Sequence, residues 1–89
     1  MNDYEMEQFY IGFRNSMSNF YKQHSFTRPL NQWSDKLNFL QKQEKFDEIR
    51  ETIIKIISLY ATDLMRTGDG YNAGILETNI KRWNRITGV

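Results

Sequence analysis

The chain has 89 residues, no cysteine and a formal net charge of +1, which arises from 12 basic and 11 acidic residues. This length predicts a single domain, residues 1–89, and the lack of cysteine excludes a disulfide framework and a thiolate metal site. The nearly balanced charge excludes a strong overall attraction to nucleic acid or to anionic lipid.

The first residues and the apolar stretches bear on where the protein works. Residues 1–5, MNDYE, lack the basic and apolar regions of a secretion signal. The longest dense apolar stretch, residues 53–61, contains Lys55 and is far shorter than the roughly 20 residues of a membrane-spanning helix. We therefore expect a cytoplasmic protein that does not insert into a membrane.

A first helix is predicted over residues 3–23. Its apolar side chains recur at alternating intervals of four and three, which places them on one helical face: Met6, Tyr10, Phe13, Met17 and Phe20. Asn2 followed by Glu5 resembles a capping box at the start of this helix. Lys22 lies near its end, where the helix dipole favours a basic residue.

A second helix is predicted over residues 29–43 and a third over residues 46–66. Pro29 suits the first turn of a helix, and the second helix then has one narrow apolar stripe: Leu30, Trp33, Leu37 and Leu40. The third helix has a wider apolar face: Phe46, Ile49, Ile53, Ile56, Tyr60 and Leu64. The β-branched run at residues 52–57 is also compatible with a buried strand, but no second strand candidate exists to pair with it.

A loop is predicted over residues 67–74, which hold three of the five glycines. Gly68 is available for a left-handed cap at the end of the third helix. A fourth helix is predicted over residues 73–87 and ends near Gly88, with an apolar face of Ile75, Leu76, Ile80, Trp83 and Ile86. The sequence thus predicts an all-α, compact four-helix domain.

The glycine-rich loop is the segment that most suggests a ligand. Residues 68–73 satisfy a G-x-G-x-x-A string, but a dinucleotide site needs a strand before it, and here a helix precedes it. No Gly-Lys-Ser/Thr follows, and an EF-hand alignment places Met65 or Ile80 where a carboxylate is required. An inter-helix turn is the favoured interpretation.

A nucleotide- or nucleic-acid-binding module is the alternative interpretation of this loop. The backbone of a glycine-rich segment can direct N–H groups at a phosphate, and the fourth helix interleaves basic side chains with Trp83. The candidate anion or nucleic-acid contacts are Arg66, Gly68, Gly70, Asn72, Lys81, Arg82 and Arg85.

No arrangement of residues predicts catalysis. His24 stands beside Ser25, but sequence neighbours rarely face each other, and no third residue can be named to orient the pair. Paired carboxylates such as Asp47 and Glu48 lie on polar helix faces, where solvated charge is the ordinary state. We expect a protein that is not an enzyme and that uses no metal and no cofactor.

Six apolar or aromatic residues fall outside the predicted stripes and form the candidate interface: Tyr4, Ile11, Tyr21, Phe39, Ile54 and Tyr71. Aromatic residues are enriched at binding surfaces, and a small domain with a thin core gains stability from a partner. The alternative is that they are scattered surface residues, which are common in soluble proteins.

The expected function is that of a small non-enzymatic interaction protein that binds a protein partner stoichiometrically, as an inhibitor, adaptor or regulator. Few Ala and Pro beside many Asn, Ile and Lys is typical of AT-rich phage and mobile-element genes, which suggests host takeover or counter-defence. A small structural subunit of an assembly is a further alternative. Net charge alternates in sign along the four helical regions, which is compatible with a homo-oligomer; the favoured interpretation is that neighbouring antiparallel helices of one chain complement each other.

Overall fold

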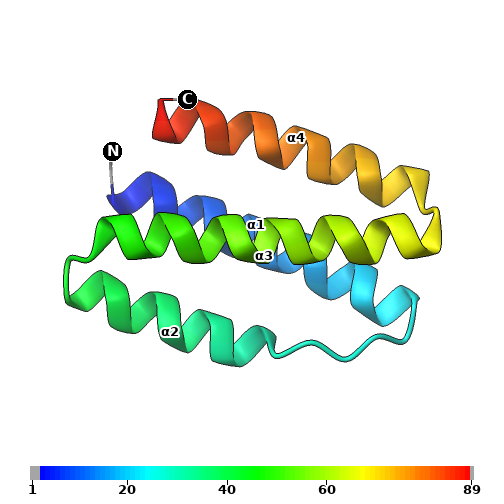
Figure 1. Cartoon of the computed structure of the whole chain (residues 1–89), viewed down its shortest axis with the longest axis horizontal. Helices are drawn as coiled ribbons and strands as arrows, with labels where there is room; N and C mark the ends of the chain where they lie inside the picture. The colour runs from blue at the N-terminus through cyan, green and yellow to red at the C-terminus, as the bar shows by residue number, and fades with distance from the viewer. Residues whose placement is uncertain (1–2, 89) are drawn as a thin grey trace.

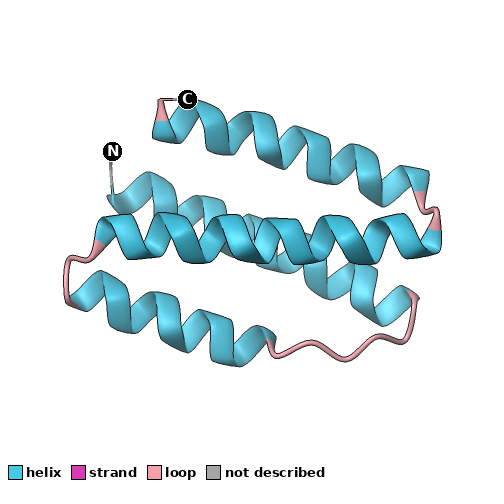
Figure 2. Cartoon of the chain, viewed as in Figure 1, coloured by secondary structure: helices cyan, strands magenta, loops and turns pink. Residues whose placement is uncertain are grey.

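Four α-helices build the part of the chain that the computed structural model describes, residues 3–88: α1 (Asp3–Gln23), α2 (Leu30–Lys42), α3 (Phe46–Thr67) and α4 (Gly70–Thr87). In Figure 2 these helices are joined by loops, the longest of which follows α1, and residues 3–88 contain no strand. The predicted all-α, four-helix architecture is confirmed, and residues 52–57 lie within α3 rather than in a strand. Asn2, the expected capping residue, lies outside the described residues.

The helices form a flat bundle. In Figure 1, α3 runs in front of α1, while α2 and α4 lie on opposite sides of this pair, and the molecule measures 36 × 26 × 17 Å. The start of α1, the end of α4 and the α2–α3 connection lie at one end of the bundle. The α1–α2 and α3–α4 connections lie at the other end, where most of the polar contacts between elements are found.

Large aromatic side chains fill the core around α1. Phe9, Phe13, Phe20 and Tyr60 have no exposed surface. The rings of Phe13 and Phe20 meet the ring of Tyr60 edge-on, with centroid separations of 5.6 and 5.3 Å, and Phe9 lies 5.0 Å from Trp83. Such pairs contribute about 0.5–1.5 kcal/mol each beyond the burial of their surface. Aromatic packing therefore joins α1 to both α3 and α4.

The buried face of α1 is wider than the predicted stripe. All five side chains of that stripe are buried, and so are Phe9 and Tyr21. The expectation that Tyr21 lies outside the packed face was wrong, because its side chain is only 3% exposed. The reason is the position of α1, which packs against α2, α3 and α4 and so has to bury more than one stripe.

The observed limits of α2 and α3 differ from the predicted ones by one residue at most. α2 begins after Pro29, whose carbonyl accepts a hydrogen bond from the Trp33 N–H at 3.1 Å. α3 ends at Thr67 and is capped by Gly68, which adopts the predicted left-handed conformation (φ +67°) and donates its N–H to the Leu64 carbonyl at 3.0 Å. Gly88 ends α4 in the same way.

The predicted loop at residues 67–74 was too long, because α4 begins at Gly70 rather than at residue 73. Asp69 caps the helix: its carboxylate accepts the N–H of Asn72, and its carbonyl accepts the N–H of Ala73, both at 3.0 Å. An Asp cap stabilises a helix by about 1 kcal/mol, which is comparable to what a glycine inside a helix costs. Within residues 3–88, no helix is both long and apolar enough to cross a membrane.

Candidate functional site

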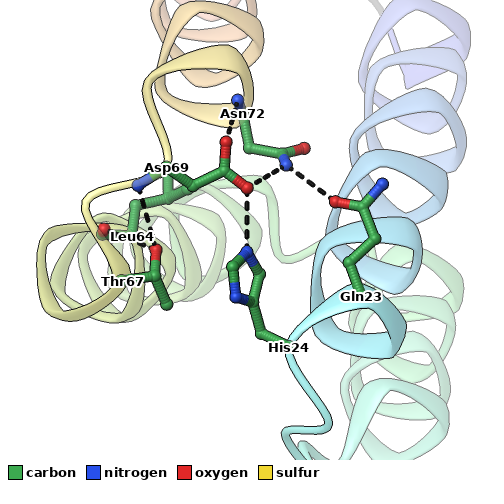
Figure 3. A network of polar contacts seen from close by, with 6 residues as sticks. All are labelled: Gln23, His24, Leu64, Thr67, Asp69 and Asn72. Atoms are coloured by element: carbon green, nitrogen blue, oxygen red, sulfur yellow. Dashed lines mark hydrogen bonds and ion pairs between the residues drawn. The ribbon is translucent and has the colours of Figure 1, made fainter.

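Polar side chains from three elements meet at the end of the bundle where the α1–α2 and α3–α4 connections lie (Figure 3). Nε2 of His24, which follows α1, lies 2.8 Å from Oδ2 of Asp69, which precedes α4. The side-chain amide of Asn72 donates to the same Oδ2 at 2.6 Å and to Oε1 of Gln23 on α1 at 3.0 Å. This network ties the end of α1 to the start of α4.

Asp69 is the centre of the network, and both of its carboxylate oxygens accept hydrogen bonds. The hydrogen bond with His24, and then those with Asn72, lower the pKa of Asp69 from 3.8 to about 2. The carboxylate is therefore ionised at all but very low pH. Its negative charge also lies at the N-terminus of α4, where the helix dipole favours an anion.

A second carboxylate, Asp63 on α3, has no exposed surface. Arg28 holds it with two hydrogen bonds, from Nη2 to Oδ1 at 2.7 Å and from Nε to Oδ2 at 3.0 Å, and the Tyr21 hydroxyl donates to Oδ2 at 2.8 Å. The bonds from Arg28 lower the pKa of Asp63. Burial, followed by the hydrogen bond to Asp63, raises the pKa of Tyr21. Arg28 thereby fastens the α1–α2 connection to α3.

The polar side chains at this end of the bundle form hydrogen bonds with one another, and these bonds stabilise the fold. His24 is bonded to Asp69, not to Ser25, so the structure does not bring together the nucleophile and base that these sequence neighbours suggested. Asp63 is closed off from solutes, and among the described residues no group of three or more His, Cys, Asp or Glu is placed to hold a metal ion. The arrangement holds two connections against the helices.

Sequence reasoning did not find these two carboxylates, although one signal was present for each. Asp63 falls at the spacing of the buried face of α3, three residues after Tyr60, and a charge at such a position needs a buried partner. Asp69 follows the left-handed glycine and precedes Asn72 by three residues, which is the place of a capping residue. Their partners on and after α1 are 35 to 45 residues away in sequence, and no periodicity reveals them.

The candidate anion contacts lie at both ends of α4 and do not form one site. Gly68, Gly70 and Asn72 lie at its start with Arg66, whereas Lys81, Arg82 and Arg85 lie near its other end, so that Gly70 and Arg85 are about 22 Å apart along the axis. Asn72 gives its backbone N–H to Asp69, whose ionised carboxylate repels an anion. Lys81 pairs with Glu77 at 3.3 Å, and the Arg82 guanidinium lies 6.0 Å from the ring centroid of Phe9.

The candidate interface residues are scattered over the four helices. Tyr4 and Ile11 are exposed on α1, Phe39 on α2, Ile54 on α3 and Tyr71 on α4, while Tyr21 is buried. Among the described residues, Met65 on α3 is the most exposed large apolar residue, at 83%, and it was not among the predicted interface residues.

Ile54 and Met65 belong to one apolar row on α3, together with the half-buried Ile57 and Ala61. These four residues, which we call the α3 stripe, are spaced by three, four and four and therefore share one helical face. A shallow hollow of about 360 Å³ continues the stripe to α4, where Ala73 and Leu76 line it. The α3 stripe is thus a continuous apolar surface next to the start of α4.

A half-open cavity of about 400 Å³ lies between α1 and α2, above α3. Its floor is apolar and consists of Met6, Leu37, Ile49 and Ile53. Tyr10 and Arg14, one helical turn apart on α1, lie on its wall, and Glu7 and Gln41 lie on its rim. The cavity is as large as the smaller pockets that bind small molecules, which start at about 300 Å³.

Two polar atoms of these wall residues, the Tyr10 hydroxyl and Nε of Arg14, are buried and have no hydrogen-bond partner among the described residues. Burial raises the pKa of Tyr10, and the nearby Ser34 hydroxyl and Arg14 charge oppose this rise in part. Arg14 donates from Nη2 to Oδ1 of Asn31 at 2.5 Å, but no described carboxylate pairs with it. A buried donor without an acceptor costs about 1–3 kcal/mol.

Comparison of the chain with protein-family models, with curated proteins and with solved structures finds no match.

Proposed function

We propose that this chain is a non-enzymatic interaction protein that binds a protein partner stoichiometrically through the α3 stripe and acts as an inhibitor, adaptor or regulator. The observation that supports this proposal is the exposure of apolar side chains in one row on α3, where Ile54 is 47% and Met65 83% exposed. The carboxylates of Asp63 and Asp69 are occupied by internal partners, which leaves the apolar surface as the main unused feature of α3.

The form of the stripe indicates what kind of partner fits. Its residues are spaced like the contact positions of packed helices, and the hollow beside Ala61 and Met65 can receive a side chain from outside. Methionine is unbranched and adapts to the shape of its neighbours, as at other helix-binding surfaces. The partner segment is therefore an amphipathic helix with apolar residues at intervals of three and four.

The proposal for where the protein acts is based on its amino-acid composition. A chain poor in Ala and Pro and rich in Asn, Ile and Lys supports an origin in a phage or mobile element. A stoichiometric binder from such a source would act in the cytoplasm of a host cell, in host takeover or counter-defence.

The test is affinity capture from a host-cell lysate with quantification of the retained protein. The wild-type chain should retain a partner at one-to-one stoichiometry, and Met65→Glu should abolish retention because it places a charge in the α3 stripe. Phe39→Glu is the matched control, since Phe39 is also an exposed apolar residue, 59% exposed, but lies on α2. Equal retention by wild type and Met65→Glu would contradict the proposal.

A further inference from the structure

We propose that the cavity between α1 and α2 binds a small amphipathic monocarboxylate, whose carboxylate contacts the guanidinium of Arg14 and whose apolar body lies on the floor formed by Leu37, Ile49 and Ile53. This site is separate from the α3 stripe, and the two proposals stand independently. Arg14 lies on α1 and lines the wall of the cavity.

The charge of the ligand follows from Arg14. Its side chain is half-buried, and it has no carboxylate partner among the described residues. A carboxylate supplies the acceptors that a guanidinium fork requires and neutralises its charge.

The size and shape of the ligand follow from the floor. The floor residues are buried and apolar, and a volume of about 400 Å³ holds an acyl chain or ring system of moderate length rather than a macromolecular segment. Glu7 lies on the rim about 10 Å from Arg14 along the axis of α1 and repels a second anionic group. The cavity therefore favours one carboxylate at the Arg14 end and an uncharged tail.

The direct test is titration of the full chain with decanoate and with decan-1-ol, below the concentration at which either aggregates, by calorimetry and by amide chemical shifts. Decanoate should bind at least about tenfold more tightly than the alcohol, and the shifts should lie on α1 and α2 around the cavity. A charge-assisted hydrogen bond is strong enough to give this ratio.

One variant and a control connect the binding to Arg14. Arg14→Gln should weaken decanoate binding at least about tenfold and leave decan-1-ol binding unchanged. Arg82→Gln is the control, because Arg82 is also half-buried but lies on α4 beside Phe9. Absence of decanoate binding, equal binding of acid and alcohol, or full binding by Arg14→Gln would overturn the proposal.

Discussion

His24 Nε2 and Asp69 Oδ2 lie 2.8 Å apart, and this contact joins the connection after α1 to the connection before α4 across 45 residues of sequence. The same carboxylate caps α4 through Asn72, and Asn72 in turn bonds to Gln23. One aspartate thus holds three elements, and its ionisation should be coupled to folding.

The coupling predicts loss of stability in acid. The pKa of Asp69 in the folded chain is about 2, below its ordinary value of 3.8, so its contribution is present above 3.8 and is lost as the pH falls towards 2. Asp69→Asn, which keeps a capping side chain, should show a smaller loss over this interval than the wild type. Urea unfolding at several pH values between 2 and 6 measures the free energy of unfolding of both proteins. The same dependence of this free energy on pH in wild type and variant would contradict the prediction.

Removal of the Arg28 side chain should strongly destabilise the fold. Arg28→Gln leaves the fully buried Asp63 carboxylate without its cation, and breaking a buried pair in this way costs about 3–5 kcal/mol. Lys81→Gln is the control, because Lys81 and Glu77 form an exposed pair one turn apart on α4, for which the expected cost is about 0.3–0.5 kcal/mol. Equal free energies of unfolding for the two variants would show that the buried pair is not important.

Two buried tyrosines should respond in opposite ways to loss of their hydroxyl groups. Tyr21→Phe removes a hydrogen bond to Asp63 and should lower the free energy of unfolding by about 1–3 kcal/mol. The Tyr60 hydroxyl has no partner among the described residues, and burial raises its pKa to about 12, so Tyr60→Phe should leave stability unchanged or increase it. Thermal unfolding of both variants tests the pair, and a greater loss for Tyr60→Phe would contradict it.

Gly68 and Gly74 should also respond in opposite ways to replacement by alanine. A Cβ at either position meets no atom within 4 Å, so the effect of each substitution on stability depends on the backbone conformation alone. Gly74 lies inside α4, where alanine is better than glycine by about 1 kcal/mol, whereas Gly68 has a φ of +67°, where alanine costs about 1–2 kcal/mol. In denaturant unfolding, the free energy of unfolding should be higher for Gly74→Ala than for the wild type and lower for Gly68→Ala. The reverse order would rule out this explanation.

The helices could be predicted from the sequence because local spacing and end signals agreed along most of the chain. Gly68 and Gly88 ended α3 and α4 as expected. The prediction failed at the start of α4, since composition alone assigned Gly70 and Gly74 to a loop. The Asp69 cap and the packing of Leu76 and Trp83 keep these residues in the helix.

The polar contacts and the cavity could not be predicted in the same way, because they depend on which helices become neighbours. The burial of Tyr21 follows from the enclosure of α1 by three helices, which its own periodicity does not show. The pairing of Arg28 with Asp63 requires the α1–α2 connection to cross the end of α3. The spacing of Ile54 was enough to predict it as a surface residue. The exposure of Met65 in the α3 stripe could be seen only in the structure.

Photo-crosslinking from the α3 stripe tests the central claim most directly. A photoreactive amino acid replaces Met65 in one variant and Phe39 in another, and each variant is irradiated in a lysate of the cells in which the protein acts. Binding through the stripe predicts one discrete crosslinked product from position 65, heavier than the chain by the mass of one partner, and none from position 39. Crosslinking from position 39 alone, or from neither position, would contradict it.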